Sequence, residues 1–367
     1  MNGTFSFTFN TNSLEEGDYK LTVDCTDNML VYQSNTYYIG EDASASFHVT
    51  ESGELPAGNT FTALQNLIDG CGGTVLNLTE NYTFDPAVDS GLINGIVINK
   101  PLTINGNNVR LDADYQSKIF NIQNSEVVLN NITFLNARSN NNNKDGGAIV
   151  YSVSGVEIHN STFINNTALG SGGAISASAN GLSIKICNST FIDNVAGKYG
   201  GALRIGNGSE IYDSVFTGNN ASSIGGAVHI MNDDVLKIVS NCSFENNTAP
   251  KAGAINCGGG LIENSTFISN QAKTSIAGAV YSSKYNLTLN NCTFEDNNAT
   301  AGGAVYAEKN LTVVNSTFNL NHAVSGNGGA LYINDNIEIY DSNFTGNNAS
   351  STGGAVYVKN NLALSNS

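Results

Sequence analysis

A unit of 25 to 28 residues recurs nine times between about residue 125 and the C-terminus of this chain. Each copy pairs an aliphatic-x-Asx-small-x-Phe stretch with a Gly-Gly-Ala-aliphatic stretch about ten residues later, as in Gly146-Gly147-Ala148. In two copies alanine replaces the first glycine, at Ala252 and Ala277. A fixed period of this length is typical of a solenoid, in which each repeat packs only on its neighbours.

Each copy predicts a strand followed by a corner. The fifth residue before the phenylalanine is always aliphatic, and the residue two positions further back often is. That period of two indicates a strand with one buried face. The third residue before the phenylalanine is always Asn or Asp, which tolerate left-handed backbone geometry and so predict a corner. These corner residues are Asn131, Asn160, Asn188, Asp213, Asn241, Asn264, Asn291, Asn315 and Asp341.

A second asparagine, three residues after the phenylalanine, recurs in eight copies from Asn166 to Asn347. Stacked coils would align such asparagines into amide ladders along the axis. The residue after each Gly-Gly-Ala is again aliphatic, and no segment within the period has helical spacing. The sequence therefore predicts an all-β fold, a right-handed parallel β-helix of about 11–12 coils, which satisfies its backbone groups through the coils above and below.

The chain divides into four expected segments. Residues 1–50 alternate as strands and predict part of an immunoglobulin-like β-sandwich, with residues 51–59 as a linker. Residues 60–124 form an N-terminal cap and irregular first coils, because Phe61–Ile68 has helical spacing and could cover the first coil. Residues 125–367 hold the regular repeats. Both ends interrupt a pattern, so we expect an internal piece of a longer protein.

Composition excludes several functions. The net charge is −16, and such a surface repels phosphate backbones, which argues against nucleic-acid binding. No apolar run approaches the ~20 residues that span a bilayer. The six cysteines lack metal-ligand spacing, and we expect neither a metal nor a cofactor. Cys242 and Cys292 are two coils apart, roughly 10 Å, too far for a disulfide.

The start of the repeat region, from Phe61 through Ile98-Asn99-Lys100-Pro101-Leu102, resembles the adhesin-like surface proteins of methanogenic archaea. The Gly-Gly-Ala-Ile and Phe-x-x-Asn pairs are similar to the repeats of chlamydial polymorphic outer membrane proteins. The resemblance covers residues 57–367. It implies a β-helix at the cell surface, outside the cell, that adheres to glycans or other cells. The family has no agreed catalytic residues, and the oligomeric state stays open.

Two alternative functions are a carbohydrate-active enzyme (a polysaccharide lyase or hydrolase) and a passive surface-layer or stalk element. A glycosidase needs two facing carboxylates. The only Asp-Asp doublet is Asp233-Asp234, in a loop, while Asp213 and Asp341 occupy the corner position. The four histidines are scattered and solitary. We therefore expect no catalytic residues and a protein that is not an enzyme.

The best candidate for binding is a row of tyrosines. The third residue past the second corner glycine is expected to point outward, and in the last four copies it is Tyr281, Tyr306, Tyr332 and Tyr357. Tyrosine rings stack on sugar rings at low entropic cost, which favours a binding stripe. Tyrosine also favours strands, so a purely structural ladder is the competing interpretation.

Asn-x-Ser/Thr sequons are numerous. Exposed ones such as Asn286 and Asn310 could carry glycans if the protein is secreted. Sequons at the corner before the phenylalanine, such as Asn160, are expected to be enclosed in ladders and closed to modification.

Overall fold

The computed structural model describes residues 17–23, 29–32, 35–38, 43–49 and 59–367, which fall into two units, Met1–Gly58 and Asn59–Ser367. The first unit has two antiparallel pairs: β1 (Gly17–Val23) with β4 (Ala43–Val49), and β2 (Met29–Tyr32) with β3 (Asn35–Tyr38). The predicted sandwich over residues 1–50 lies partly outside the described residues, and the predicted linker over residues 51–59 lies almost wholly outside them. Both stay predictions.

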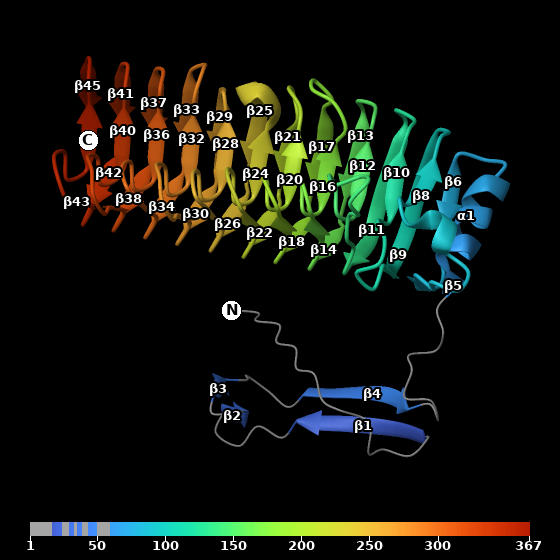
Figure 1. Cartoon of the computed structure of the whole chain (residues 1–367). Helices are drawn as coiled ribbons and strands as arrows, with labels where there is room; N and C mark the ends of the chain where they lie inside the picture. Colours follow the sequence, from blue (N-terminus) through green and yellow to red (C-terminus); the bar gives the residue numbers. More distant parts are fainter. Residues whose placement is uncertain (1–16, 24–28, 33–34, 39–42, 50–58) are drawn as a thin grey trace. The chain divides into compact units, whose positions relative to one another are not determined.

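The second unit is a β-helix of parallel strands whose coils follow one another from α1 to β45 (Figure 1). Each regular coil crosses three surfaces in turn. It contributes one strand to a first sheet, two strands separated by the Asx corner to a second, and one very short strand to a third. The Gly-Gly corner then leads to the next coil. The parallel solenoid that the repeat predicts is confirmed.

Within residues 59–367 the first sheet has 11 strands in sequence order. They are β8 (Ile96–Ile98), β10 (Phe120–Ile122), β12 (Ile149–Tyr151), β16 (Ile175–Ala177), β20 (Leu203–Ile205), β24 (Val228–Ile230), β28 (Ile255–Cys257), β32 (Val280–Ser282), β36 (Val305–Ala307), β40 (Leu331–Ile333) and β44 (Val356–Val358). The third sheet has 8 strands. They are β15 (Thr167–Ala168), β19 (Val195–Ala196), β23 (Asn220–Ala221), β27 (Thr248–Ala249), β31 (Gln271–Ala272), β35 (Asn298–Ala299), β39 (His322–Ala323) and β43 (Asn348–Ala349).

The second sheet holds the remaining strands. Its irregular beginning is β5 (Asn59–Thr60), β6 (Val75–Asn77), β7 (Tyr82–Thr83), β9 (Leu102–Asp112) and β11 (Val127–Leu135). The regular pairs are β13 (Val156–His159) and β14 (Thr162–Ile164), β17 (Ile184–Cys187) and β18 (Thr190–Ile192), β21 (Glu210–Tyr212) and β22 (Val215–Thr217), β25 (Val235–Ser240) and β26 (Ser243–Glu245), β29 (Gly259–Glu263) and β30 (Thr266–Ile268), β33 (Leu287–Asn290) and β34 (Thr293–Glu295), β37 (Leu311–Val314) and β38 (Thr317–Asn319), β41 (Ile337–Tyr340) and β42 (Asn343–Thr345), followed by β45 (Leu362–Ser365).

Helix α1 (Phe61–Gly70) covers the first coil and buries Phe61, Leu64 and Ile68. The Thr60 hydroxyl accepts a hydrogen bond from Ala63 N at 3.2 Å, which caps the helix. The buried Asp89 carboxylate accepts from Phe61 N at 3.0 Å and from Thr62 N at 2.7 Å. Two short 3-10 helices complete the elements, Ser90–Leu92 and Met231–Asp233. Sequence reasoning missed Asp89, which lies 28 residues after the helix start.

The core contains a continuous stack of phenylalanines. The ring of Phe216, for example, lies 4.7 Å from that of Phe191 and 4.7 Å from that of Phe244, with planes nearly parallel. The same arrangement continues from Phe134 to Phe344. The in-register pairing of one coil on the next places identical side chains above one another, and burial of each ring stabilises the coil that carries it.

A second core column is the asparagine ladder that follows the phenylalanines. Asn219 Nδ2 donates to Asn247 Oδ1 at 3.0 Å and to the carbonyl oxygen of Phe191 at 3.0 Å. Its own Oδ1 accepts from the side chain and the backbone N–H of Asn194. Asparagine fits this buried place because its amide supplies donors and acceptors on both sides at once.

The two glycines of the Gly-Gly corner have different roles. The first adopts a positive φ, for example +71° at Gly225, and Ala252 and Ala277 take the same conformation at +55° and +65°. The second leaves no room for a side chain. A Cβ on Gly226 would lie 1.9 Å from the carbonyl oxygen of Gly253 in the next coil. The coils therefore lie too close together at this position for any side chain.

All nine Asx residues before the phenylalanines have φ between 45° and 57°, the left-handed conformation of a corner. Eight of them are exposed, and Asn131 is half-buried. Several form ladders on the outside of the coil, such as Asn188 Nδ2 donating to Asn160 Oδ1 at 2.7 Å. The prediction that corner sequons are enclosed is wrong, because the ladder lies on the solvent side of the backbone.

Candidate binding face on the C-terminal coils

The predicted tyrosine row lies on the outer side of the first sheet. Tyr281, Tyr306, Tyr332 and Tyr357 are paired in register on β32, β36, β40 and β44. Their neighbours along each strand point into the core, as Val305 and Ala307 do beside Tyr306. We call this outward column of the first sheet the tyrosine column, and it continues toward the N-terminus as Asn256, His229, Arg204 and Ser176.

The N-terminal half of the column is covered by residues that precede the Gly-Gly corner. Ser176 and Asn256 are buried. Arg204 crosses the column, with a guanidinium nitrogen 3.3 Å from Asp145 Oδ2 and 2.9 Å from the carbonyl oxygen of Ala177. These polar groups satisfy one another, so this part of the column offers little to a ligand.

His229 lies in the middle of the column beneath the ring of Tyr199, at a centroid distance of 4.9 Å. Asn256 Nδ2 lies 3.1 Å from His229 Nδ1 and donates to Asp233 Oδ1 at 3.0 Å. Burial lowers the pKa of His229 to about 4, although Asp233 acts in the opposite direction. The structure thus links His229 through Asn256 to one member of the Asp233-Asp234 doublet, and the three side chains satisfy one another.

Tyr281 marks the boundary of the covered half, with 7% of its surface exposed. The Lys251 ammonium lies 3.4 Å from its ring centroid, and Ile224 and Ile276 pack beside it. Its hydroxyl donates to Glu308 Oε1 at 3.2 Å. Burial, reinforced by Glu308, raises the pKa of Tyr281. This tyrosine therefore points outward but presents almost none of its ring to solvent.

The column opens at the next three coils, where Tyr306, Tyr332 and Tyr357 are half-buried. The rings of Tyr306 and Tyr332 lie 4.4 Å apart with planes 6° apart, whereas Tyr357 is tilted by 34° from Tyr332. Asn334 Nδ2 donates to the hydroxyl of Tyr306 at 3.0 Å and also contacts Glu308. Stacking occupies ring faces between these tyrosines, so ring edges and hydroxyl groups remain for a ligand.

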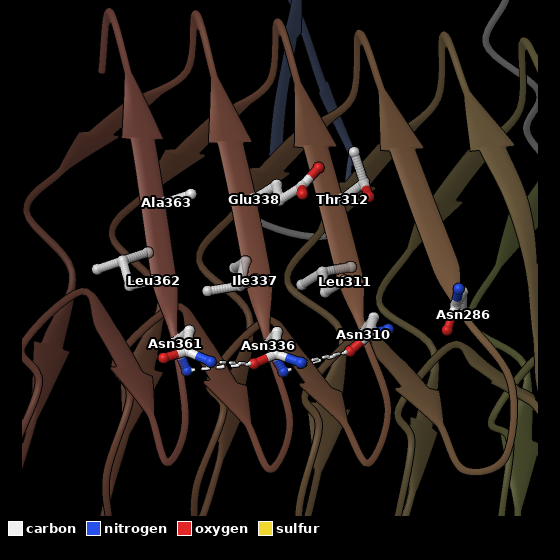
Figure 2. A pocket seen from close by; sticks show the side chains of 10 residues that line it. All are labelled: Asn286, Asn310, Leu311, Thr312, Asn336, Ile337, Glu338, Asn361, Leu362 and Ala363. Atoms are coloured by element: carbon white, nitrogen blue, oxygen red, sulfur yellow. Dashed lines mark hydrogen bonds between the residues drawn. The ribbon is translucent and has the colours of Figure 1, made fainter.

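On the other side of the turn that follows these strands lies a groove of about 480 Å³ (Figure 2). A row of asparagines runs along it, one per coil: Asn336 Nδ2 donates to Asn310 Oδ1 at 3.1 Å, and Asn361 Nδ2 donates to Asn336 Oδ1 at 2.9 Å. The groove is lined by Asn286, Asn310, Leu311, Thr312, Asn336, Ile337, Glu338, Asn361, Leu362 and Ala363. We call it the asparagine groove.

The equivalent surface of the earlier coils has a smaller groove, of about 110 Å³. Where the C-terminal coils have an asparagine before the strand, these coils have Gly155, Ser183 and Gly208. Charged side chains alternate beside it, with Glu157, Lys185 and Glu210 in register. Two columns on either side of one turn therefore change character over the same C-terminal coils. No single motif signals this change, which becomes visible only when the copies are stacked.

The other predicted sites lie as follows. Asn286 and Asn310 are exposed and both line the asparagine groove, and their glycosylation stays a prediction. Of the cysteines in the described residues, Cys71, Cys187, Cys242, Cys257 and Cys292 are free. Burial raises the pKa of Cys242 to about 12 and that of Cys292 to about 11. Across the described residues no group of three or more His, Cys, Asp or Glu could hold a metal ion.

Comparisons with known proteins agree with this architecture. Residues 181–344 match the family model for a right handed beta helix region. Residues 160–178 and 341–359 match the Chlamydia polymorphic membrane protein repeat. The hand of the helix and the similarity to that repeat are thereby confirmed. The likeness to methanogen proteins stays a prediction.

No curated protein matches the chain. Among solved structures, it is similar to the Streptococcus pneumoniae surface protein and adhesin PfbA. The identity is 12%, the match covers 82% of this chain and 95% of that one, and the TM-score is 0.41. The described part of the chain contains no helix with the length and apolar character that a bilayer span requires.

Proposed function

We propose that this chain is part of an extracellular surface protein whose β-helix binds carbohydrate on other cells or surfaces, without chemical conversion of the ligand. The observation that carries the proposal is the opening of the tyrosine column. Tyr306, Tyr332 and Tyr357 are accessible on three consecutive coils. On the coils before them the column is either buried, at Ser176, Asn256 and Tyr281, or engaged by neighbouring side chains, at Arg204 and His229.

The chemistry of the open part supports a carbohydrate ligand. Phenol hydroxyls donate and accept hydrogen bonds, and the carboxylate of Glu308 and the amide of Asn334 lie beside them. Sugar hydroxyls also donate and accept, so each can pair with such a mixed set. The edges of the tyrosine rings add apolar surface that the C–H groups of a sugar can contact.

The similarity of residues 160–178 and 341–359 to the Chlamydia polymorphic membrane protein repeat supports a surface location. Repetition suits adhesion, since weak contacts on successive coils add along one rigid scaffold. In this proposal the β strands of residues 1–50 belong to an immunoglobulin-like spacer, and the partner is a glycan or a cell-surface molecule.

A glycan array tests the proposal. The chain is compared with the double variant Tyr332→Ala, Tyr357→Ala, and with Tyr115→Ala as a control. Tyr115 is 47% exposed and follows β9, outside the tyrosine column. We expect a set of bound glycans to be lost in the double variant and all of them to be retained in the control. Retention of every bound glycan in the double variant would remove the tyrosine column as a site.

The non-enzymatic part of the proposal has its own measurement. The glycans that bind are incubated with the chain, and new reducing ends and unsaturated products are assayed. We expect none. Product formation would favour the carbohydrate-active alternative, and an array on which nothing binds would favour a passive stalk.

A further inference from the structure

We infer that the asparagine groove is a second binding site, for an uncharged, extended polysaccharide that lies along the axis of the β-helix. The inference does not depend on the tyrosine column, which lies on the opposite side of the turn. It depends on the hydrogen-bonding groups that the groove leaves free, on its charge, and on its direction across the coils.

Several polar groups along the groove have no partner among the described residues. They include the side-chain amide of Asn286, the Nδ2 group of Asn310 and the hydroxyl of Thr312. The groove therefore offers a donor and an acceptor at Asn286, a donor at Asn310, and a group of both kinds at Thr312. Hydroxyl groups, which act as both donor and acceptor, pair with this set.

The ladder holds these groups in place. Asn336 donates to both Asn310 Oδ1 and Asp335 Oδ1, and accepts from Asn361. Its amide is saturated, so Asn336 positions its neighbours and leaves the ligand contacts to them. A side chain fixed before binding loses little conformational entropy when a ligand arrives.

Charge selects the class of polysaccharide. Glu338 is the one ionisable side chain that lines the groove, and it accepts a hydrogen bond from the Tyr340 hydroxyl at 3.2 Å. A single negative charge in an acidic protein disfavours uronic acids, sulfates and phosphates, and no cation lines the groove to attract them. The equivalent groove of the earlier coils is lined by three ionisable side chains, Glu157, Lys185 and Glu210.

Direction follows from the register. Asn310, Asn336 and Asn361 stand on consecutive coils, and the groove runs across them along the axis of the helix. Successive coils are about 4.8 Å apart, so a chain of sugars that follows the axis passes a new set of groups at each coil. Affinity is then expected to increase with the number of sugars.

The experiment uses the full chain, made in a host without N-glycosylation so that Asn286 and Asn310 are unmodified. Calorimetry measures binding of neutral oligosaccharides from one to six sugars (glucan, mannan, galactan and N-acetylhexosamine series) and of six-sugar uronic acid oligomers. The variant Asn310→Ala, Thr312→Val removes two free groups. Ser183→Ala is the matched control, since Ser183 has the equivalent position in the earlier groove. Thermal melting verifies that the variants fold.

We expect at least tenfold tighter binding of the longest neutral oligomer than of the monosaccharide, at least tenfold weaker binding by the groove variant, and no change in the control. Failure of every neutral series to bind overturns the inference, as does equal affinity for the uronic acid oligomer. Binding that is lost in Tyr332→Ala, Tyr357→Ala but kept in the groove variant overturns it too, and leaves the tyrosine column as the site. Weaker binding of the neutral oligomer by the groove variant supports the inference, whether or not the tyrosine variant also binds more weakly.

Discussion

The rings of Tyr306 and Tyr332 lie face to face, 4.4 Å between centroids and 6° between planes. The sequence predicted a row of rings on which sugars could stack. In the structure the tyrosines stack on one another, and the groups that remain for a partner are the hydroxyls and the ring edges. The hydroxyl groups therefore become the first target for mutation.

The variant Tyr332→Phe keeps the stacked ring and removes the hydroxyl. If the hydroxyl contacts the ligand, we expect glycan binding to weaken roughly fivefold, the equivalent of about 1 kcal/mol for one hydrogen bond. The melting temperature is expected to stay unchanged because the stack is retained. Calorimetry with a glycan identified on the array gives the affinity, and equal affinity in the two proteins contradicts a hydroxyl contact.

A side chain at the second glycine of a corner is expected to disrupt the stack of coils. In Gly226→Ala the new Cβ would lie 1.9 Å from a backbone oxygen, so the coils must separate. We expect a loss of about 3 kcal/mol or more in the free energy of unfolding, measured by denaturant titration. The control is Gly72→Ala, where no atom lies within 4 Å of the new Cβ and φ is not in the left-handed region, and we expect a change within about 0.5 kcal/mol. Equal losses in both would show that close approach is not the cause.

The buried asparagine ladder and the exposed Asx corner are expected to respond differently to an Asn→Asp substitution. Asn219→Asp removes both buried donors and puts a carboxylate next to Asn247 Oδ1 and the carbonyl oxygen of Phe191, which is expected to cost about 3 kcal/mol or more. At the exposed corner, Asn264 accepts from Asn291 Nδ2 just as Asp213 accepts from Asn241 Nδ2, so Asn264→Asp keeps this contact and is expected to change stability by less than about 0.5 kcal/mol. Denaturation midpoints of the two variants provide the measurement.

His229 predicts a loss of stability in acid. Burial lowers its pKa from 6.5 to about 4 in the folded protein, so folding favours the neutral ring. The stabilisation is complete above pH 6.5 and is lost as the pH falls from 6.5 toward 4, where the unfolded chain takes up a proton more readily. In His229→Gln this part of the pH dependence is expected to disappear. Melting curves between pH 4 and 8 test it, and an identical pH profile in both proteins would exclude His229 as the cause.

The architecture was predictable because its causes are local and repeat nine times. An Asx at a positive φ, an aliphatic residue at a fixed offset and a corner of two glycines, or of alanine and glycine in two copies, recur in every copy. Asp89 could not be predicted as the cap of α1, because the contact joins residues 28 positions apart in the irregular coils. The covering of Tyr281 by Lys251 likewise depends on which residue precedes a corner in the neighbouring coil.

The candidate site followed only in part from the sequence. Alignment of the copies placed four tyrosines in one column, and the structure retains that column. Exposure was not predictable from the column itself, because it is decided by side chains such as Ile224 and Ile276 that flank it. The asparagine groove was missed for a similar reason. Asn310 and Asn336 lie 26 residues apart and have the same neighbours only once the coils are stacked.

The corner glycines have a consequence for how such a molecule changes over generations. Gly226 lies close to a carbonyl oxygen of the next coil, and its own carbonyl oxygen lies close to the corresponding glycine of the previous coil. Regular coils therefore contact their neighbours in one common way. Duplication or loss of a whole coil by recombination between similar stretches of the gene would keep every such contact intact. The length of the β-helix can thus change by one coil at a time, while the surface of the few coils that bear the tyrosines stays the same.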